Sequence, residues 1–155
     1  MVDDLSGNVS GNVPGSVSGY PSHVAEVIAR DQSILDSFGM TVSGAKDGVC
    51  EIKCIVPETL VNAAGFAHGS IAYSLMDTAC AYALGSLGVR GVTLNGNTTY
   101  VKGAQANSTL HGKVSVVSRT SRIVSLKGEV FLQTDTGVEL AAHGNFIFQL
   151  IVVRT

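Results

Sequence analysis

Residues 70–84 constrain the fold of this chain more than any other segment. The segment reads SIAYSLMDTACAYAL, and on the helix that its length predicts, apolar side chains occur all the way round. Such a helix must be enclosed by other elements, because no broad face of it suits water. Its only polar members are Ser70, Ser74, Asp77 and Thr78. We therefore expect one long buried helix at the centre of the fold.

Asp77 is the unusual residue of this helix. At 100° per residue it shares one narrow stripe with Ser70 and Ser74. Burying a carboxylate without a partner costs several kcal/mol, and no Lys or Arg lies within one turn. The sequence thus favours a catalytic role for Asp77. The alternative is that its carboxylate caps a neighbouring backbone.

The remaining segments favour antiparallel strands. Residues 49–56 alternate, with Cys50, Ile52, Cys54 and Val56 on one face and Glu51 and Lys53 on the other. Four longer extended runs follow, at about residues 91–101, 109–118, 122–133 and 137–151. In the last run the expected inward positions are Leu140, Ala142, Phe146, Phe148 and Leu150. Half-buried antiparallel strands alternate in this way.

The order of elements defines the fold class. A short helix over residues 23–38 precedes a strand or hairpin, then the central helix, then a meander of long strands. This order predicts an α+β fold in which an antiparallel sheet wraps around one long buried helix. Residues 1–20, with their repeated Ser-Gly-Asn-Val, predict a disordered tail, and residues 21–155 a single domain.

Composition excludes several classes of function. A net charge of -2 provides no general basic field for nucleic acid or an anionic membrane, and no apolar run approaches the roughly 18 residues of a membrane span. Three cysteines indicate a reducing compartment, so we expect a cytoplasmic protein. No Cys/His spacing suits a metal, and we expect no metal or cofactor. Charged residues make up only 14%, which favours self-association.

The segment before the central helix suggests an anion or oxyanion site. Gly69 stands at the helix start, where backbone N–H groups are free and the helix dipole adds positive potential. Such a site suits a phosphate or a polarised carbonyl oxygen. Gly69 and Asp77 are eight residues apart, about 12 Å along a helix. If both act on one substrate, they must come from two subunits of a dimer.

These residues resemble a known family signature. The pattern Asn62-x2-Gly65-x2-His68-Gly69-x7-Asp77, followed by a run of small residues, resembles that of the hot-dog-fold acyl-CoA thioesterases, and most closely their phenylacetate-degradation (PaaI-type) branch. The resemblance covers about residues 35–150. It implies a hot-dog fold, a homodimer often paired into a tetramer, and hydrolysis of an aryl- or medium-chain acyl-CoA to the free acid and CoA.

The resemblance also implies roles for single residues. Asp77 would be the nucleophile or general base, and the Gly69 N–H would polarise the thioester carbonyl. Asn62 would hold the carbonyl or the attacking water, His68 would brace the site, and Thr93 would orient the water. Two purely structural interpretations stay open, because Asn62 could cap a turn and His68 could have only a packing role.

Further residues are candidates for contacts with the substrate or with CoA. They are Gly65, Ser70, Ser74, Arg122, Lys102 and Arg90. The chain departs from the family in two places. Ser70 replaces the second glycine of the usual His-Gly-Gly, and residues 100–103 read Tyr-Val-Lys-Gly where the family strand motif usually ends in Arg/Lys-Pro. These departures leave the acyl group unspecified.

Other functions of this fold family remain as alternatives. A hydratase or dehydratase needs a paired acid and histidine, and the Asp-x4-His order typical of such enzymes is absent. A non-catalytic acyl-CoA sensor fused to a DNA-binding domain is another alternative, although a 20-residue tail is too short for a helix-turn-helix. A degenerate scaffold without activity is the third.

Overall fold

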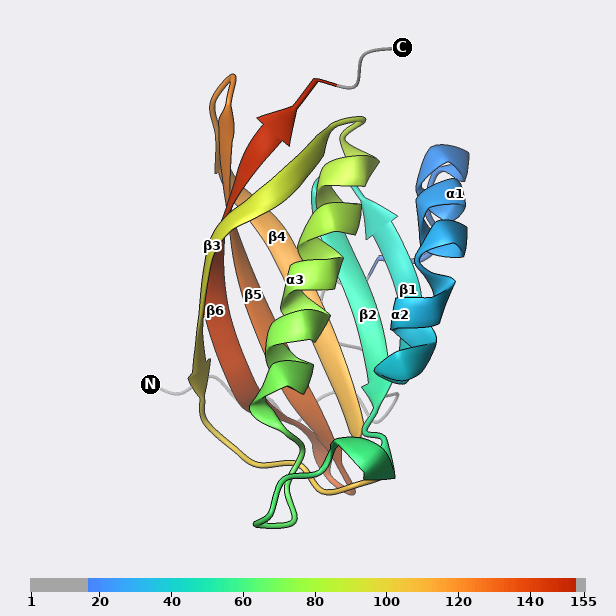
Figure 1. Ribbon diagram of the computed structural model, residues 1–155, viewed down its shortest axis with the longest axis vertical. Coiled ribbons are helices and arrows are strands. Elements are labelled where there is room, and N and C mark those ends of the chain that lie inside the picture. Colours follow the sequence, from blue (N-terminus) through green and yellow to red (C-terminus); the bar gives the residue numbers. More distant parts are fainter. Residues whose placement is uncertain (1–16, 153–155) are drawn as a thin grey trace.

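A computed structural model describes residues 17–152 of the chain. One antiparallel sheet of six strands curves around the long helix α3 (Gly69–Ser86), as Figure 1 shows. The strands are β1 (Met40–Lys46), β2 (Val49–Ile55), β3 (Arg90–Tyr100), β4 (Thr109–Arg119), β5 (Ile123–Thr134) and β6 (Gly137–Ile151), in the spatial order β1-β2-β4-β5-β6-β3. The predicted class, α+β with a sheet wrapped around one helix, is confirmed.

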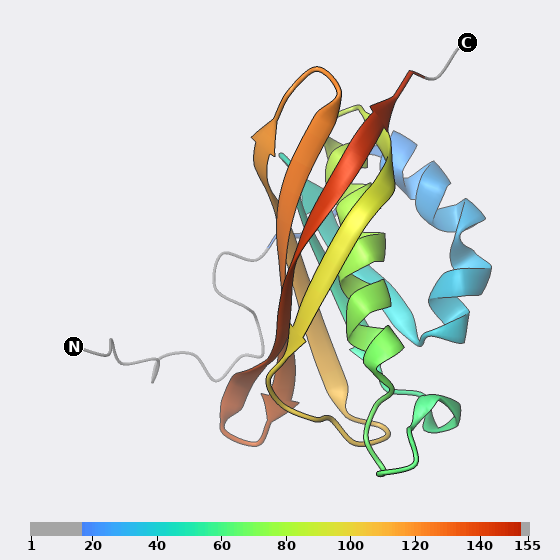
Figure 2. The same ribbon diagram turned by 60° about the vertical axis from the view of Figure 1, so that its left-hand side comes forward.

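The position of β3 corrects the predicted meander. Only β4, β5 and β6 are consecutive neighbours, whereas β3 lies beyond β6 at the edge of the sheet and pairs with it from Arg90↔Ile151 to Tyr100↔Ala142. Figure 2 shows β3 beside β6, on the side of the sheet along which α3 runs. Strand β2 pairs with β4, on the opposite side of the sheet from β3. Helix α3, which connects β2 to β3 in the chain, therefore crosses from one half of the sheet to the other. Among the described residues, 17–152, the outer edge of β3 therefore has no strand partner.

Helix α3 is enclosed on most of its circumference, as its composition predicts. Its buried residues are Ile71, Leu75, Met76, Ala79, Cys80, Tyr82, Ala83 and Leu84. They pack on the concave face of the sheet, where Gly112 and Gly128 leave room, because a Cβ on either would lie 3.0 Å or less from side-chain atoms of Leu75 or Met76. The stripe that carries Asp77 stays partly open in the single chain. The expected full burial of this acid is therefore wrong for one chain on its own.

The helix predicted for residues 23–38 is broken in two. Helix α1 (Ser22–Arg30) and helix α2 (Gln32–Ser37) meet at Asp31, whose φ and ψ of -90° and 5° are not helical. The Tyr82 hydroxyl donates a hydrogen bond of 3.0 Å to Oδ2 of Asp31, which ties the break to α3. Burial explains the break, because the bend lets α1 and α2 both reach the core.

A β-bulge changes the faces of β6. Val130 pairs with Ala142 but Phe131 pairs with Leu140, so Ala141 is an extra residue in β6. Ala141 is consequently buried, and Leu140, predicted to face inward, is 36% exposed. Of the other predicted inward residues, Ala142, Phe146 and Phe148 are buried and Leu150 is half-buried. A bulge reverses the alternation on one side of it, which a period-2 pattern does not anticipate.

The predicted tail divides at the start of the described residues. Residues 1–16 lie outside them, whereas residues 17–20 run along β1, where Ala45 donates to the carbonyl of Gly19 over 2.9 Å. Gly44 permits this approach, because a Cβ there would lie 2.5 Å from the carbonyl oxygen of Val17. The described domain thus begins before residue 21.

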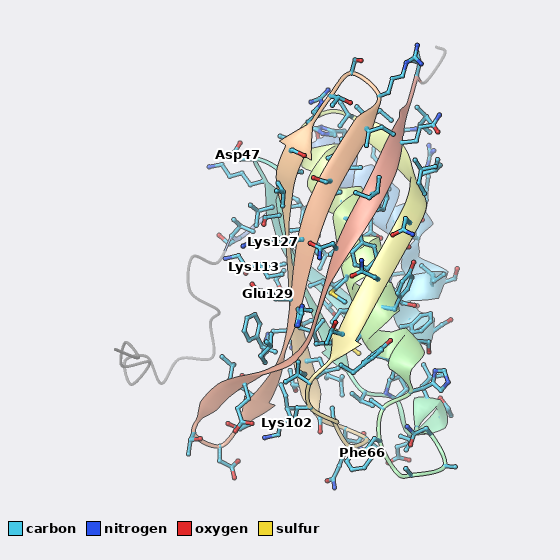
Figure 3. All side chains as sticks on the ribbon, turned by 90° about the vertical axis from the view of Figure 1, so that its left-hand side faces the viewer. Asp47, Phe66, Lys102, Lys113, Lys127 and Glu129 are labelled. Carbon is cyan, nitrogen blue, oxygen red and sulfur yellow. The ribbon has the colours of Figure 1, made fainter. Side chains whose placement is uncertain are left out.

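Glu51 is buried on the outer face of the sheet. Sequence alternation places it with Lys53 on the solvent side, yet it is only 8% exposed. Its Oε1 lies 3.6 Å from Nζ of Lys113 on β4, a residue labelled on the outer face in Figure 3. Burial raises the pKa of Glu51, and Lys113, the Val17 backbone and His111 partly offset that rise. The ionised carboxylate is thus less favourable in the folded chain than in the unfolded one.

Replacing Glu51 by glutamine should increase stability at neutral pH. A raised folded-state pKa favours the protonated form, so the contribution of Glu51 to stability is present below its unfolded pKa and is lost as pH rises through its folded pKa. Glu51→Gln therefore should raise the urea midpoint at pH 7–8, with the gain shrinking toward pH 4. Glu26→Gln, at an exposed position of α1, is the control. A lower midpoint for Glu51→Gln at pH 7 would contradict this account.

Candidate active site

The N-terminal turn of α3 leaves one backbone donor free. His68 caps the helix, and its Nδ1 accepts the backbone N–H of Ser70 over 3.1 Å. The carbonyl of His68 accepts the N–H of Ile71 over 2.9 Å. No group within residues 17–152 accepts the N–H of Gly69, the first residue of the helix. The positive end of the helix dipole makes the Gly69 N–H a stronger hydrogen-bond donor.

The same contacts define the tautomer of His68. A nitrogen that accepts a backbone N–H carries a lone pair, so Nδ1 is unprotonated and the Ser70 hydroxyl, 2.7 Å away, also donates to it. The proton of the neutral ring is consequently on Nε2. Ser70, which departs from the family's second glycine, thus contacts the side chain of His68 directly.

A pocket of about 380 Å³ opens beside Gly69. It lies between the start of α3, the end of β3 and the inner face of the sheet. Its lining is mainly apolar and comprises Asn62, Phe66, Ala67, His68, Gly69, Ile71, Ala72, Tyr100, Val101, Lys102, Gly103, Ala104, Leu110, Val130, Ala141 and Ala142. An apolar pocket with a few polar groups at one end is the usual form of a small-molecule site.

Asn62 and Gly65 shape the loop at the pocket. Oδ1 of Asn62 accepts hydrogen bonds from the N–H groups of Ala64 and Phe66 over 2.9 and 3.1 Å. The side chain thus stabilises a turn, as the structural interpretation of Asn62 predicts. Asn62 also lines the pocket. Gly65 does not, and its φ of 85° explains the glycine by backbone conformation.

Asp77 and Thr93 form a second polar group, away from the pocket. The Thr93 hydroxyl donates to Oδ1 of Asp77 over 2.7 Å. Thr93 lies on β3 immediately before a bulge at Leu94, so its side chain reaches the helix. Neither residue lines the pocket that contains Gly69, and Ser74, one turn before Asp77, does not line it either. One chain therefore carries the two halves of the predicted site at separate places.

The three predicted cationic residues lie at opposite ends of the sheet. Lys102 lines the pocket and forms an ion pair with Glu139. Figure 3 shows Lys102 at the same end of the molecule as Phe66. Arg90 is opposite Ile151 in the sheet, and the carbonyl of Arg122 accepts the N–H of Leu150 over 2.7 Å, so both arginines belong to the other end. The single chain thus does not assemble them into one cation site.

Two residues of the pocket were missed by sequence reasoning. The Tyr100 hydroxyl donates to the carbonyl of Gly69 over 2.6 Å, and the ring of Phe66 lies over Gly103. The departure of residues 100–103 from the family motif was the available signal for both contacts.

The interpretation of Cys80 as a core residue is confirmed. Burial raises the pKa of its thiol, so Cys80 is a poor nucleophile.

The curved sheet around a central helix is the hot-dog fold, and comparisons with known proteins agree. Residues 64–139 match the family model described as the thioesterase superfamily. A hypothetical thioesterase from Streptococcus pneumoniae TIGR4, solved with coenzyme A, is 20% identical, with a TM-score of 0.74 over 83% of this chain and 99% of that one. The E. coli PaaI protein from the phenylacetic acid degradation operon is 20% identical, with a TM-score of 0.76 over 83% and 91%.

A third structure is slightly closer in sequence. Conserved protein PA5202 from Pseudomonas aeruginosa is 26% identical, with a TM-score of 0.70 over 79% of this chain and 99% of that one. None of the curated proteins matches the chain. Within residues 17–152, no helix is long and apolar enough to cross a membrane, and no group of three His, Cys, Asp or Glu side chains could hold a metal ion.

Proposed function

We propose that the protein is an acyl-CoA thioesterase of the PaaI-type branch, which hydrolyses an aryl- or medium-chain acyl-CoA to the free acid and CoA. The observation that carries this proposal is the free N–H of Gly69 at the start of α3, beside a mainly apolar pocket. The match to the thioesterase superfamily and the CoA in the Streptococcus pneumoniae structure support the same activity.

The chemistry needs an oxyanion donor and an activated nucleophile. Water attacks the thioester carbonyl while Asp77 takes its proton, and the Thr93 hydroxyl orients the carboxylate or the water. The carbonyl oxygen gains negative charge and is stabilised by the Gly69 N–H. The C–S bond then breaks, and the CoA thiolate leaves and is protonated. Direct attack by the carboxylate, through an anhydride that water then hydrolyses, uses the same residues.

The acyl group would occupy the pocket. About 380 Å³ is near the lower end of the usual range for small-molecule sites, roughly 300–1,000 Å³. The wall is formed by Leu110, Val130 and small alanines, with Phe66 and Tyr100 supplying aromatic rings. This lining favours an aromatic ring or a chain of moderate length. His68 and Asn62 would stand at the polar end, near the carbonyl.

A dimer would bring the two halves of the site together. Strand β3, whose outer edge pairs with no strand within residues 17–152, is eleven residues long and exposes Val92, Leu94 and Tyr100. A long apolar edge strand is a template for pairing with another chain. Antiparallel pairing of two β3 strands about a two-fold axis near Asn97 would place Thr93 of each chain opposite Tyr100 of the other. Asp77 would then approach Gly69 of the partner subunit, as the distance along α3 requires.

The same pairing would collect the cationic residues. With the axis near Asn97, Arg90 of the partner subunit would lie opposite Gly103, beside Lys102 at the pocket. Arg122 would follow, because it contacts Leu150 next to the residue paired with Arg90. Two arginines and a lysine at one mouth suit the phosphates of CoA. The resemblance also implies that two such dimers pair into a tetramer.

A panel of thioesters tests the activity. Benzoyl-, phenylacetyl-, hexanoyl- and palmitoyl-CoA are incubated with the protein, and released CoA is measured with a thiol-trapping dye. We expect turnover of the first three and little of palmitoyl-CoA, whose chain exceeds the pocket. Turnover of none would overturn the proposal, and CoA binding without turnover, measured by calorimetry, would indicate an acyl-CoA-binding protein. Sedimentation of an active monomer would exclude the shared site.

A further inference from the structure

Tyr100 contacts the backbone of Gly69. It is the last residue of β3, and its hydroxyl donates to the carbonyl oxygen of Gly69 over 2.6 Å. Its ring lies against the same glycine, because a Cβ on Gly69 would be 3.2 Å from the hydroxyl oxygen and 3.3 Å from Cζ. Tyr100 therefore joins the edge strand of the sheet to the first residue of α3.

The contact adds a hydrogen bond to a peptide unit in the first turn of α3. The unit between Gly69 and Ser70 is bound at both ends, since its carbonyl accepts from Tyr100 and its N–H donates to Nδ1 of His68. The preceding unit, which carries the Gly69 N–H, is held at its carbonyl by Ile71. Glycine has the greatest backbone freedom of any residue, and the first turn of a helix frays readily. These contacts hold the peptide units on both sides of Gly69, and with them the direction of its free N–H.

The hydroxyl proton of Tyr100 is committed to the protein. The hydroxyl already donates this proton in its hydrogen bond to the Gly69 carbonyl, so the phenol cannot donate it to the substrate at the same time. An oxyanion donor is effective only if it is oriented before the reaction, because reorienting it during the reaction would cost part of the stabilisation. Tyr100 orients Gly69, and the Gly69 N–H stabilises the oxyanion that forms on the substrate carbonyl. Loss of the Tyr100 hydroxyl should therefore lower kcat more than it changes KM.

From this geometry we propose that Tyr100 is a positioning residue, whose hydroxyl fixes the orientation of the Gly69 N–H. The inference rests on the proposed thioesterase function for its kinetic consequence, but not for its structural one. The Tyr100 ring also leaves a side chain at residue 69 little room, since a Cβ there would lie 3.2 Å from the hydroxyl oxygen. The edge strand β3 would thus have two roles, because besides pairing with a second chain it carries Tyr100, which orients the Gly69 N–H.

Tyr100→Phe tests the role, because it keeps the ring and removes only the hydroxyl. We expect kcat for a turned-over thioester to fall about tenfold with KM within about twofold, since small displacements of a reacting group cost large factors in rate. In ¹H–¹⁵N spectra the Gly69 and Ser70 amide signals should shift, and the Gly69 amide should exchange faster with solvent. Tyr20→Phe, at an exposed tyrosine whose hydroxyl makes no described contact, is the matched control.

The outcomes separate this inference from the proposed function. A changed Gly69 amide in a protein that turns over no thioester would support the role of Tyr100 and refute the activity. Unchanged amide signals together with unchanged kcat would overturn the inference while the thioesterase activity stands. A rise in KM alone would also overturn it, because it would identify Tyr100 as a residue that binds substrate.

Discussion

Replacing Asp77 by asparagine is expected to lower kcat for thioester hydrolysis by at least about 10²-fold, the usual contribution of a general base. Asparagine keeps the shape of the side chain, and its carbonyl oxygen can still accept the Thr93 hydroxyl, which Asp77 accepts over 2.7 Å. The helix and the β3 contact are thus preserved, and only the capacity to take a proton or attack a carbonyl is lost. Steady-state kinetics of CoA release measures the effect.

A matched control comes from a second aspartate, which is exposed. Asp47 lies in the turn between β1 and β2 with a φ of 51°, a conformation that asparagine also tolerates. Asp47→Asn should leave kcat unchanged, and both variants should keep the wild-type unfolding midpoint. If Asp77→Asn retained activity within about threefold of the wild type, Asp77 would have a structural role only.

Replacing Gly69 by proline should have an effect of similar size, about 10²- to 10³-fold on kcat, because it deletes the donor of the oxyanion site. The backbone is compatible with the change. Gly69 is the first helical residue, where proline is favoured, and His68 at φ -58° and ψ 142° already has the conformation that precedes proline. Gly69→Ala, which retains the N–H, controls for the added side chain against Tyr100.

Mixing the two inactive variants tests whether the site is shared between subunits. A heterodimer of Asp77→Asn and Gly69→Pro would contain one site with both substitutions and one with neither. Random reassociation should then restore about a quarter of the wild-type activity, since half of the dimers would carry one working site. Sites contained within single chains would recover nothing, and that result would rule out the arrangement about Asn97. Separately refolded and mixed samples provide the baseline.

Local patterns predicted the secondary structure well where burial is uniform. The apolar run around Leu75 and Cys80 predicted α3, and the alternation of Val124, Leu126 and Val130 predicted the faces of β5, because both signals repeat with the period of the element. The predictions were wrong at Asp31 and Leu140. There a single residue breaks the period, through a helix bend tied to Tyr82 and through a bulge.

The candidate site shows the same division. Spacing identified Gly69 and Asp77 as a helix start and an isolated acid, and a distance along the helix separated them. The Tyr100 contact with Gly69, the turn held by Asn62 and the pairing of Lys102 with Glu139 are not visible in any window of the sequence. Each joins groups whose positions depend on how β3, β6 and the loop before α3 come together.

The amino-acid sequence alone determined that a helix without a polar face must lie inside a sheet, and that Gly69 and Asp77 stand about 12 Å apart on it. These properties follow from side-chain character and a constant rise per residue. Only the tertiary structure decided that β3 is an edge strand beyond β6, that Thr93 meets Asp77 and that Tyr100 holds Gly69. Strand order and register arise from packing between distant segments, which no local pattern encodes.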